Sequence, residues 1–223
     1  LFRSTQVLPT FRPDDLFVED AQAFSQFADK LAQITETEIL VFGDFSAALA
    51  KRIDHFHETG CRISDHGPVT IDYQPADAAC IDALFSKKRH GESLSLHETA
   101  QLNSALFVML AREYKKRGWA MQIHFGAIRS NNTQMLRKLG SNTGFDSIAD
   151  QTHLATGLNR LLDAMAQNNG LPKTILYNLN ASYNDVVATT IANFQSGEDG
   201  VKSPMQLGSG WWFNDTRRGM ENQ

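Results

Sequence analysis

Short apolar segments alternate along the chain with longer segments in which apolar residues recur every three or four positions. The first pattern is typical of strands and the second of amphipathic helices. Strands are expected at residues 7–11, 61–64, 121–126, 174–180 and 205–213. Helices are expected at residues 21–34, 44–59, 76–88, 95–117 and 184–194, with a short one from 131 and another ending near 168.

Capping residues mark the ends of several expected helices. Ser95 and Glu98 have the spacing of a capping box, and Gly118 follows the end of the same helix. Asp44 is a candidate N-cap for the second helix. Asp150 or Thr152 could cap the helix that ends near residue 168.

The alternation of strands and helices predicts an α/β fold with a parallel sheet. A doubly wound sheet and a (β/α)₈ barrel both fit it, and the nucleotide patterns GxGxxG and GxxxxGK[ST] are absent. Polar residues close all five strands, which favours a barrel because barrel strands share one mouth. A barrel needs eight units and this chain supplies five, so the remaining units are expected outside this sequence, which also does not begin with Met.

The strand at 121–126 is the most informative part of the chain. Met121, Ile123 and Phe125 share one face of the pleat, while Gln122, His124 and Gly126 share the other. Arg129 and two asparagines follow directly. A lone histidine is usually structural, but several polar groups at one strand end favour a site.

Composition excludes several classes of protein. With 42% hydrophobic and 21% charged residues the chain is expected to be globular, and a net charge of −4 argues against a nucleic-acid partner. Two cysteines without metal-ligand spacing indicate a reducing compartment. No apolar run reaches the roughly 20 residues that span a bilayer, so a cytoplasmic protein without a membrane partner is expected.

Six motifs resemble one family, in order and through the whole chain. They are LPTFRPD (8–14), GCRISDHG (60–67), MQIHFGAIRSNN (121–132), LGSNTGFDSI (139–148), LPKTILYNLN (171–180) and GSGWWFND (208–215). Together they resemble the uronate (glucuronate) isomerases of the amidohydrolase superfamily. The resemblance implies an amidohydrolase-type (β/α)₈ TIM barrel, incomplete here, with residues 1–223 supplying about five βα units and lacking the first two strands and the last.

The resemblance also implies an activity. The family interconverts D-glucuronate with D-fructuronate, and D-galacturonate with D-tagaturonate, by proton transfer through a cis-enediol. Its HxH metal motif lies upstream of Leu1 and its Asp-x-Arg motif downstream of Gln223, so Asp215-Thr216-Arg217 is not read as that motif. A divalent metal, zinc first, is therefore expected on ligands outside this chain, and the isolated chain is expected to be inactive.

Two other functions stay open. One is a metal-dependent hydrolase or deaminase of the same superfamily, although the segment 174–180 lacks the histidine that would support it. The other is a carbohydrate-binding fragment without catalysis. The preferred uronate, the metal and the oligomeric state are not given by the sequence, which leaves a homo-oligomer open.

Candidate site residues follow from the strand ends. Arg12 is either a salt-bridging residue or, as the resemblance favours, a planar fork for the substrate carboxylate. His124 is assigned to the active site with its role open, a metal ligand included. Asp65 and His66 form either a carboxylate–imidazole pair or part of a turn. Arg129 either reaches the substrate or holds its loop.

The expected last strand adds two further candidates. Trp211 and Trp212 would alternate faces on it, and Trp212, nearer its end, is the candidate for stacking on the sugar. Asp215 is either a helix N-cap or a polar member of the site.

Overall fold

A parallel sheet forms the centre of the molecule. The computed structural model describes residues 5–196 and 203–221, apart from the side chains of residues 168 and 211. Strands β1 (Ile63–His66), β2 (Ala120–Phe125), β5 (Lys173–Asn178) and β6 (Met205–Gly208) lie in that order, all parallel. Phe11 adds a parallel bridge to Ser64 beyond β1. The α/β fold with parallel strands in chain order is thus confirmed, as a partial barrel.

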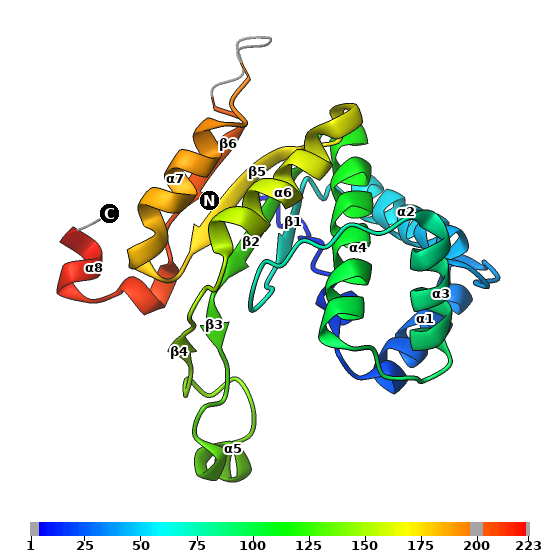
Figure 1. The fold of residues 1–223 in the computed structure, drawn as a ribbon, viewed down its shortest axis with the longest axis horizontal. Coiled ribbons are helices and arrows are strands. Elements are labelled where there is room, and N and C mark those ends of the chain that lie inside the picture. Colours follow the sequence, from blue (N-terminus) through cyan, green and yellow to red (C-terminus); the bar gives the residue numbers. More distant parts are fainter. Residues whose placement is uncertain (1–4, 197–202, 222–223) are drawn as a thin grey trace.

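Helices cover one face of this sheet (Figure 1). Helices α4 (Leu96–Lys116), α6 (Leu154–Ala166) and α7 (Asn184–Ala192) connect the successive strands and pack side by side. Helices α1 (Ala21–Thr35), α2 (Phe42–Glu58) and α3 (Ala78–Arg89) pack together beyond α4. The remaining short elements are η1 (Asp14–Phe17), η2 (Gln167–Asn169), η3 (Ala181–Tyr183), η5 (Trp211–Asn214) and α8 (Arg217–Glu221).

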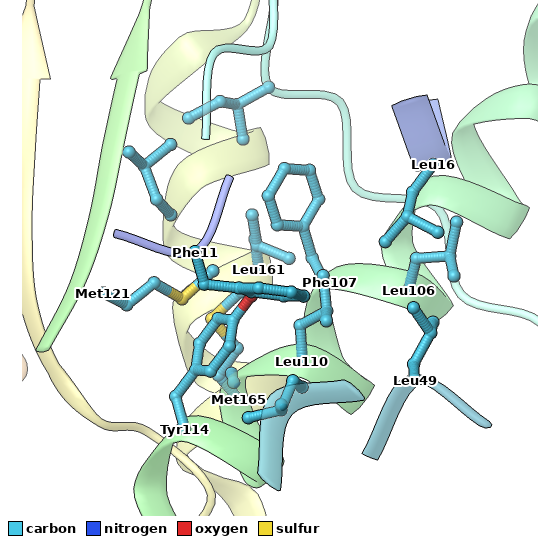
Figure 2. Close-up of a cluster of buried hydrophobic side chains, with 14 of the residues drawn as sticks. Phe11, Leu16, Leu49, Leu106, Phe107, Leu110, Tyr114, Met121, Leu161 and Met165 are labelled. Atoms are coloured by element: carbon cyan, nitrogen blue, oxygen red, sulfur yellow. The ribbon is translucent and has the colours of Figure 1, made fainter. Parts of the chain in front are cut away.

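The core lies between the sheet and these helices. Met121, Ile123 and Phe125 on β2 are almost fully buried, as the pleat predicts. Figure 2 shows Met121 beside Phe11 and Tyr114, with Leu110 and other apolar side chains of the helices around them. The opposite face of the sheet carries the half-buried and exposed residues of each strand, so the two faces have different chemistry.

Helix ends agree with the sequence in part. The capping box of α4 is confirmed, since Ser95 Oγ accepts from the Glu98 N–H at 3.3 Å and Glu98 accepts from the Ser95 N–H at 2.7 Å. Asp44 is not an N-cap, because α2 begins at Phe42; its carboxylate accepts from the Leu40 and Val41 N–H groups instead. Helix α6 begins after His153, without a side-chain cap.

Expectations about three strands need correction, and the structure adds an arm. Strand β1 covers Ile63–His66 rather than residues 61–64, so it includes Asp65 and His66. The segment 7–11 contributes only the bridge at Phe11, and Val7 is exposed. The last strand ends at Gly208, because residues 211–214 turn into the 3-10 helix η5. An arm, residues 127–148, leaves the end of β2 as the antiparallel strands β3 (Ala127–Ile128) and β4 (Ser147–Ile148) with α5 (Thr133–Leu139) between them (Figure 1).

No helix among residues 5–196 and 203–221 is both long and apolar enough to span a bilayer.

Candidate active site

A chain of polar side chains, linked by short contacts, crosses the carboxyl ends of the first strands. The Arg12 guanidinium lies 3.1 Å from Asp65 Oδ2, and His124 Nε2 lies 3.1 Å from the same oxygen. Arg12 Nε also donates to Asp14 Oδ2 at 2.8 Å. Asp65 on β1 and His124 on β2 meet because both point away from the helix layer, to the same face of the pleat.

The charge state of Asp65 follows from these contacts. Burial alone would raise the pKa of its carboxyl group. The hydrogen bond with His124, and then the charges of His124 and Arg12, outweigh that effect and hold the pKa below its ordinary value. Asp65 is therefore a carboxylate at neutral pH. It accepts a hydrogen bond from His124 Nε2–H, which fixes the orientation of the imidazole.

These side chains line a hollow of about 310 Å³ at the open face of the sheet. Its lining residues are Arg12, Asp65, Gln122, His124, Arg129 and Tyr177. A larger hollow of about 600 Å³ lies between residues 10–13, α1 and α2, but its lining contains no histidine and is largely apolar. The smaller hollow is the one that holds Asp65 together with its partners Arg12 and His124 at the strand ends.

Sequence reasoning did not assign Gln122 and Tyr177 to a site. Tyr177 Oη donates to Gln122 Oε1 at 2.6 Å, across from β5 to β2. The two-residue period of the strand could have identified Gln122, because it places Gln122 on the same face as His124. Tyr177 could be found only from the strand register, which pairs it with His124.

Gly67 makes room for the imidazole. A Cβ at Gly67 would lie 2.5 Å from His124 Cε1 and 3.2 Å from a terminal nitrogen of Arg12. Such a contact is closer than carbon atoms tolerate, so any larger residue would push the ring of His124 away from Asp65. The absence of a side chain at Gly67, directly after β1, thus allows His124 to lie next to Asp65.

Arg129 stands at the base of the arm. Its guanidinium donates to Asp146 Oδ2 at 2.7 Å, and the Ser130 N–H donates to the other carboxylate oxygen at 2.9 Å. These bonds, the backbone one first, lower the pKa of Asp146. Arg129 also borders the hollow. Both roles considered for this residue, holding the loop and reaching the site, are compatible with its position.

His66 lies on the other face of β1, so the expected pair with Asp65 does not form. It is fully buried among Phe17, Phe107 and Tyr114, and Tyr114 Oη lies 3.2 Å from its Nε2. Burial lowers the pKa of His66 to about 4, so the ring is neutral. Adjacent residues of a strand point to opposite faces, which separates His66 from the hollow.

Residues 212–215 are not among the described residues that line the hollow. Trp212 is 45% exposed and its ring stacks on Phe213 with centroids 3.9 Å apart. The expected alternation of the two tryptophans is wrong because η5 is helical; the side chain of Trp211 is outside the described residues. Asp215 is exposed, and Thr216 rather than Asp215 caps α8, accepting from the Gly219 and Met220 N–H groups.

Comparison with known proteins identifies the family of this chain. A family model described as glucuronate isomerase matches residues 2–223. The chain belongs to the glucuronate isomerase family. A curated uronate isomerase from Staphylococcus haemolyticus is 50% identical over 220 residues, covering 99% of this chain and 47% of the relative. One from Salmonella newport is 48% identical, covering 98% of this chain and 46% of the relative. The chain thus spans about half the length of these relatives.

Solved structures of the family share the fold. A uronate isomerase from Thermotoga maritima superposes with a TM-score of 0.85 at 26% identity, over 98% of this chain and 46% of that one. A glucuronate isomerase from Caulobacter crescentus gives a TM-score of 0.80 at 22% identity, over 97% of this chain and 43% of that one. At the second identity the likeness concerns the fold alone.

The family suggests a metal, but the described residues offer few ligands for one. Among residues 5–196 and 203–221, no three His, Cys, Asp or Glu side chains gather as ligands. The hollow offers one imidazole and one carboxylate, and a guanidinium lies 3.1 Å from that carboxylate. Since Arg12 already supplies the positive charge there, these residues do not make a metal site by themselves.

Proposed function

We propose that this glucuronate isomerase family chain forms part of an aldose–ketose isomerase acting on hexuronates. The reaction would interconvert D-glucuronate with D-fructuronate, and D-galacturonate with D-tagaturonate. The observation that carries the proposal is the Asp65 carboxylate, ion-paired with Arg12 and hydrogen-bonded to His124, at the carboxyl ends of parallel strands. Catalytic groups of (β/α)₈ enzymes lie at that end.

The chemistry requires groups of these kinds. Moving a proton between C2 and C1 through a cis-enediol needs a base, an acid and positive charge that stabilises the enediolate. Arg12 and Arg129 both line the hollow and supply positive charge there. A guanidinium can bind a carboxylate through two parallel hydrogen bonds. His124, oriented by Asp65, stands where it could donate a proton to a substrate oxygen or accept one.

Finer points stay predictions. A divalent metal, with zinc as the first choice, would have ligands beyond those described here and would supply Lewis-acid stabilisation. His124 as one of its ligands also stays a prediction, as do the roles of Trp212 and Asp215 in substrate binding. A small-molecule hexuronate is the expected partner, in the cytoplasm. Membership of the isomerase family favours this function over a hydrolase, a deaminase or a non-catalytic carbohydrate-binding fragment.

The test uses a hybrid in which residues 1–223 replace the matching segment of the Staphylococcus haemolyticus uronate isomerase, which is 50% identical. The hybrid should isomerise D-glucuronate, whereas the 223-residue chain alone should not. Arg12→Lys keeps the charge but loses the planar fork. It should lower kcat/KM for D-glucuronate, with a loss of transition-state stabilisation of about 1.5–3 kcal/mol.

Arg160→Lys, at an exposed arginine of α6, is the matched control and should leave kcat/KM unchanged. A folded hybrid without turnover, next to an active parent enzyme, would contradict the proposed function. Equal kcat/KM for Arg12→Lys and Arg160→Lys would instead limit Arg12 to a structural role.

A further inference from the structure

Tyr177 is held over the hollow from two sides. Its hydroxyl donates to Gln122 Oε1 at 2.6 Å, so the end of the ring is fixed to β2. Burial, and then the charge of Asp65, raise the pKa of Tyr177, and the hydroxyl stays protonated at neutral pH. Both residues line the hollow together with Arg12 and His124.

Gly208 fixes the other side of the ring. It is the register partner of Tyr177 on β6, and a Cβ at this position would overlap ring atoms Cε1 and Cδ1 of Tyr177. The aromatic ring therefore lies directly against the backbone of β6, in a place that only glycine leaves open. Two neighbouring strands thus hold the hydroxyl in one position, which is the preorganisation that a binding group needs.

The pair offers one donor and one acceptor. A phenol oxygen both donates and accepts hydrogen bonds, so Tyr177 Oη has acceptor capacity beside its bond to Gln122. Gln122 keeps its amide N–H₂ group, which donates. A sugar hydroxyl donates and accepts at the same time, so it matches both. Arg12 and Tyr177 lie on opposite sides of β2, so a ligand whose carboxylate is at Arg12 has its hydroxyls toward the pair.

We propose that the Tyr177–Gln122 pair binds a hydroxyl group of the hexuronate, with Gly208 as the residue that positions the tyrosine ring. This rests on the proposed function. The contact selects polyhydroxylated acids over simple carboxylic acids, because a ligand that lacks the hydroxyl cannot form these hydrogen bonds.

The test compares Tyr177→Phe with the unsubstituted hybrid. Phenylalanine keeps the ring and its fit against Gly208 but removes the hydroxyl. kcat/KM for D-glucuronate should fall about 10-fold or more, mainly through a higher KM, because a contact made in both ground and transition state is lost. Tyr183→Phe, at a partly buried tyrosine of η3, is the matched control and should retain full kcat/KM.

A second pair of variants tests the positioning role of Gly208. Gly208→Ala should raise KM by displacing the ring, and that effect should disappear in a Tyr177→Ala background. An equal effect of Gly208→Ala in both backgrounds would overturn the positioning role. Unchanged kinetics in Tyr177→Phe would overturn the hydroxyl contact while hexuronate turnover, and with it the proposed function, remained.

If the hybrid folds but shows no turnover, the proposed function is contradicted. The hydroxyl contact is then tested separately, by calorimetric titration of the hybrid and of Tyr177→Phe with D-glucuronate. Weaker binding to Tyr177→Phe than to the hybrid would still support the hydroxyl contact. Equal binding, or none to either protein, would overturn it.

Discussion

Asp65 and His66 are neighbours on β1, and their surroundings are opposite. Asp65 points to the open face, where it meets Arg12 and His124 and stays ionised. His66 points to the helix layer, where it is fully buried among aromatic rings and stays neutral. The two histidines of the strand ends are likewise on opposite faces, with His66 in the helix layer and His124 at the hollow. A titratable residue at a strand end is therefore informative only together with the face to which it points.

The buried position of His66 should make the stability of the fold depend on pH. The pKa of His66 lies at about 4 in the folded protein, against 6.5 for an ordinary histidine. Above about pH 6.5 His66 is neutral in both states, and its contribution to stability is complete. As the pH falls toward 4, the unfolded state takes up a proton that the folded state does not. Stability is lost in that window, by about 3 kcal/mol in total.

The measurement is the melting temperature of the hybrid between pH 7 and pH 4. His66→Gln should flatten the decline in this range. His97→Gln, at an exposed histidine of α4, serves as the control and should keep the full decline. If the melting temperatures of His66→Gln and His97→Gln fall equally between pH 7 and pH 4, the pKa of His66 is not lowered in the folded protein.

On the open face of the sheet, a smaller effect on kcat/KM is expected from a substitution at Gly67. Gly67→Ala places a methyl group against the imidazole of His124 and should shift it from Asp65. We expect kcat/KM for D-glucuronate to fall about 10-fold, a misplacement cost of about 1.4 kcal/mol, with little change in melting temperature.

Gly43→Ala in α2, where the added Cβ meets only ordinary van der Waals contact, is the matched control. Equal kcat/KM for the two glycine variants would mean that the position of His124 does not depend on Gly67.

Much of the fold could be predicted from the sequence because its signals are local. The 2-residue period of 121–126 assigned Met121 and His124 to opposite faces, and Ser95 with Glu98 marked the start of α4. The segment 211–214 was mistaken for strand because a run of aromatic residues has high β propensity, while the chain turns into a 3-10 helix there. The antiparallel arm has two-residue strands, which are too short to give a periodic pattern.

The candidate site was less predictable because it depends on register between distant strands. Arg12, Asp65 and His124 could be expected together, since each follows a strand or lies near its end. Tyr177 could not, because its partner Gln122 is 55 positions away and its neighbour Gly208 is on another strand. Pairing Asp65 with His66 followed from adjacency in sequence, which in a strand places side chains on opposite faces.

The most direct test of the account is kcat/KM of Asp65→Asn in the hybrid with D-glucuronate. The substitution keeps the shape of the side chain and removes the charge between Arg12 and His124. We predict a fall of about 100-fold, or about 2.7 kcal/mol, at a melting temperature close to that of the hybrid. An unchanged kcat/KM in a variant that is folded would contradict the assignment of the open face to the active site.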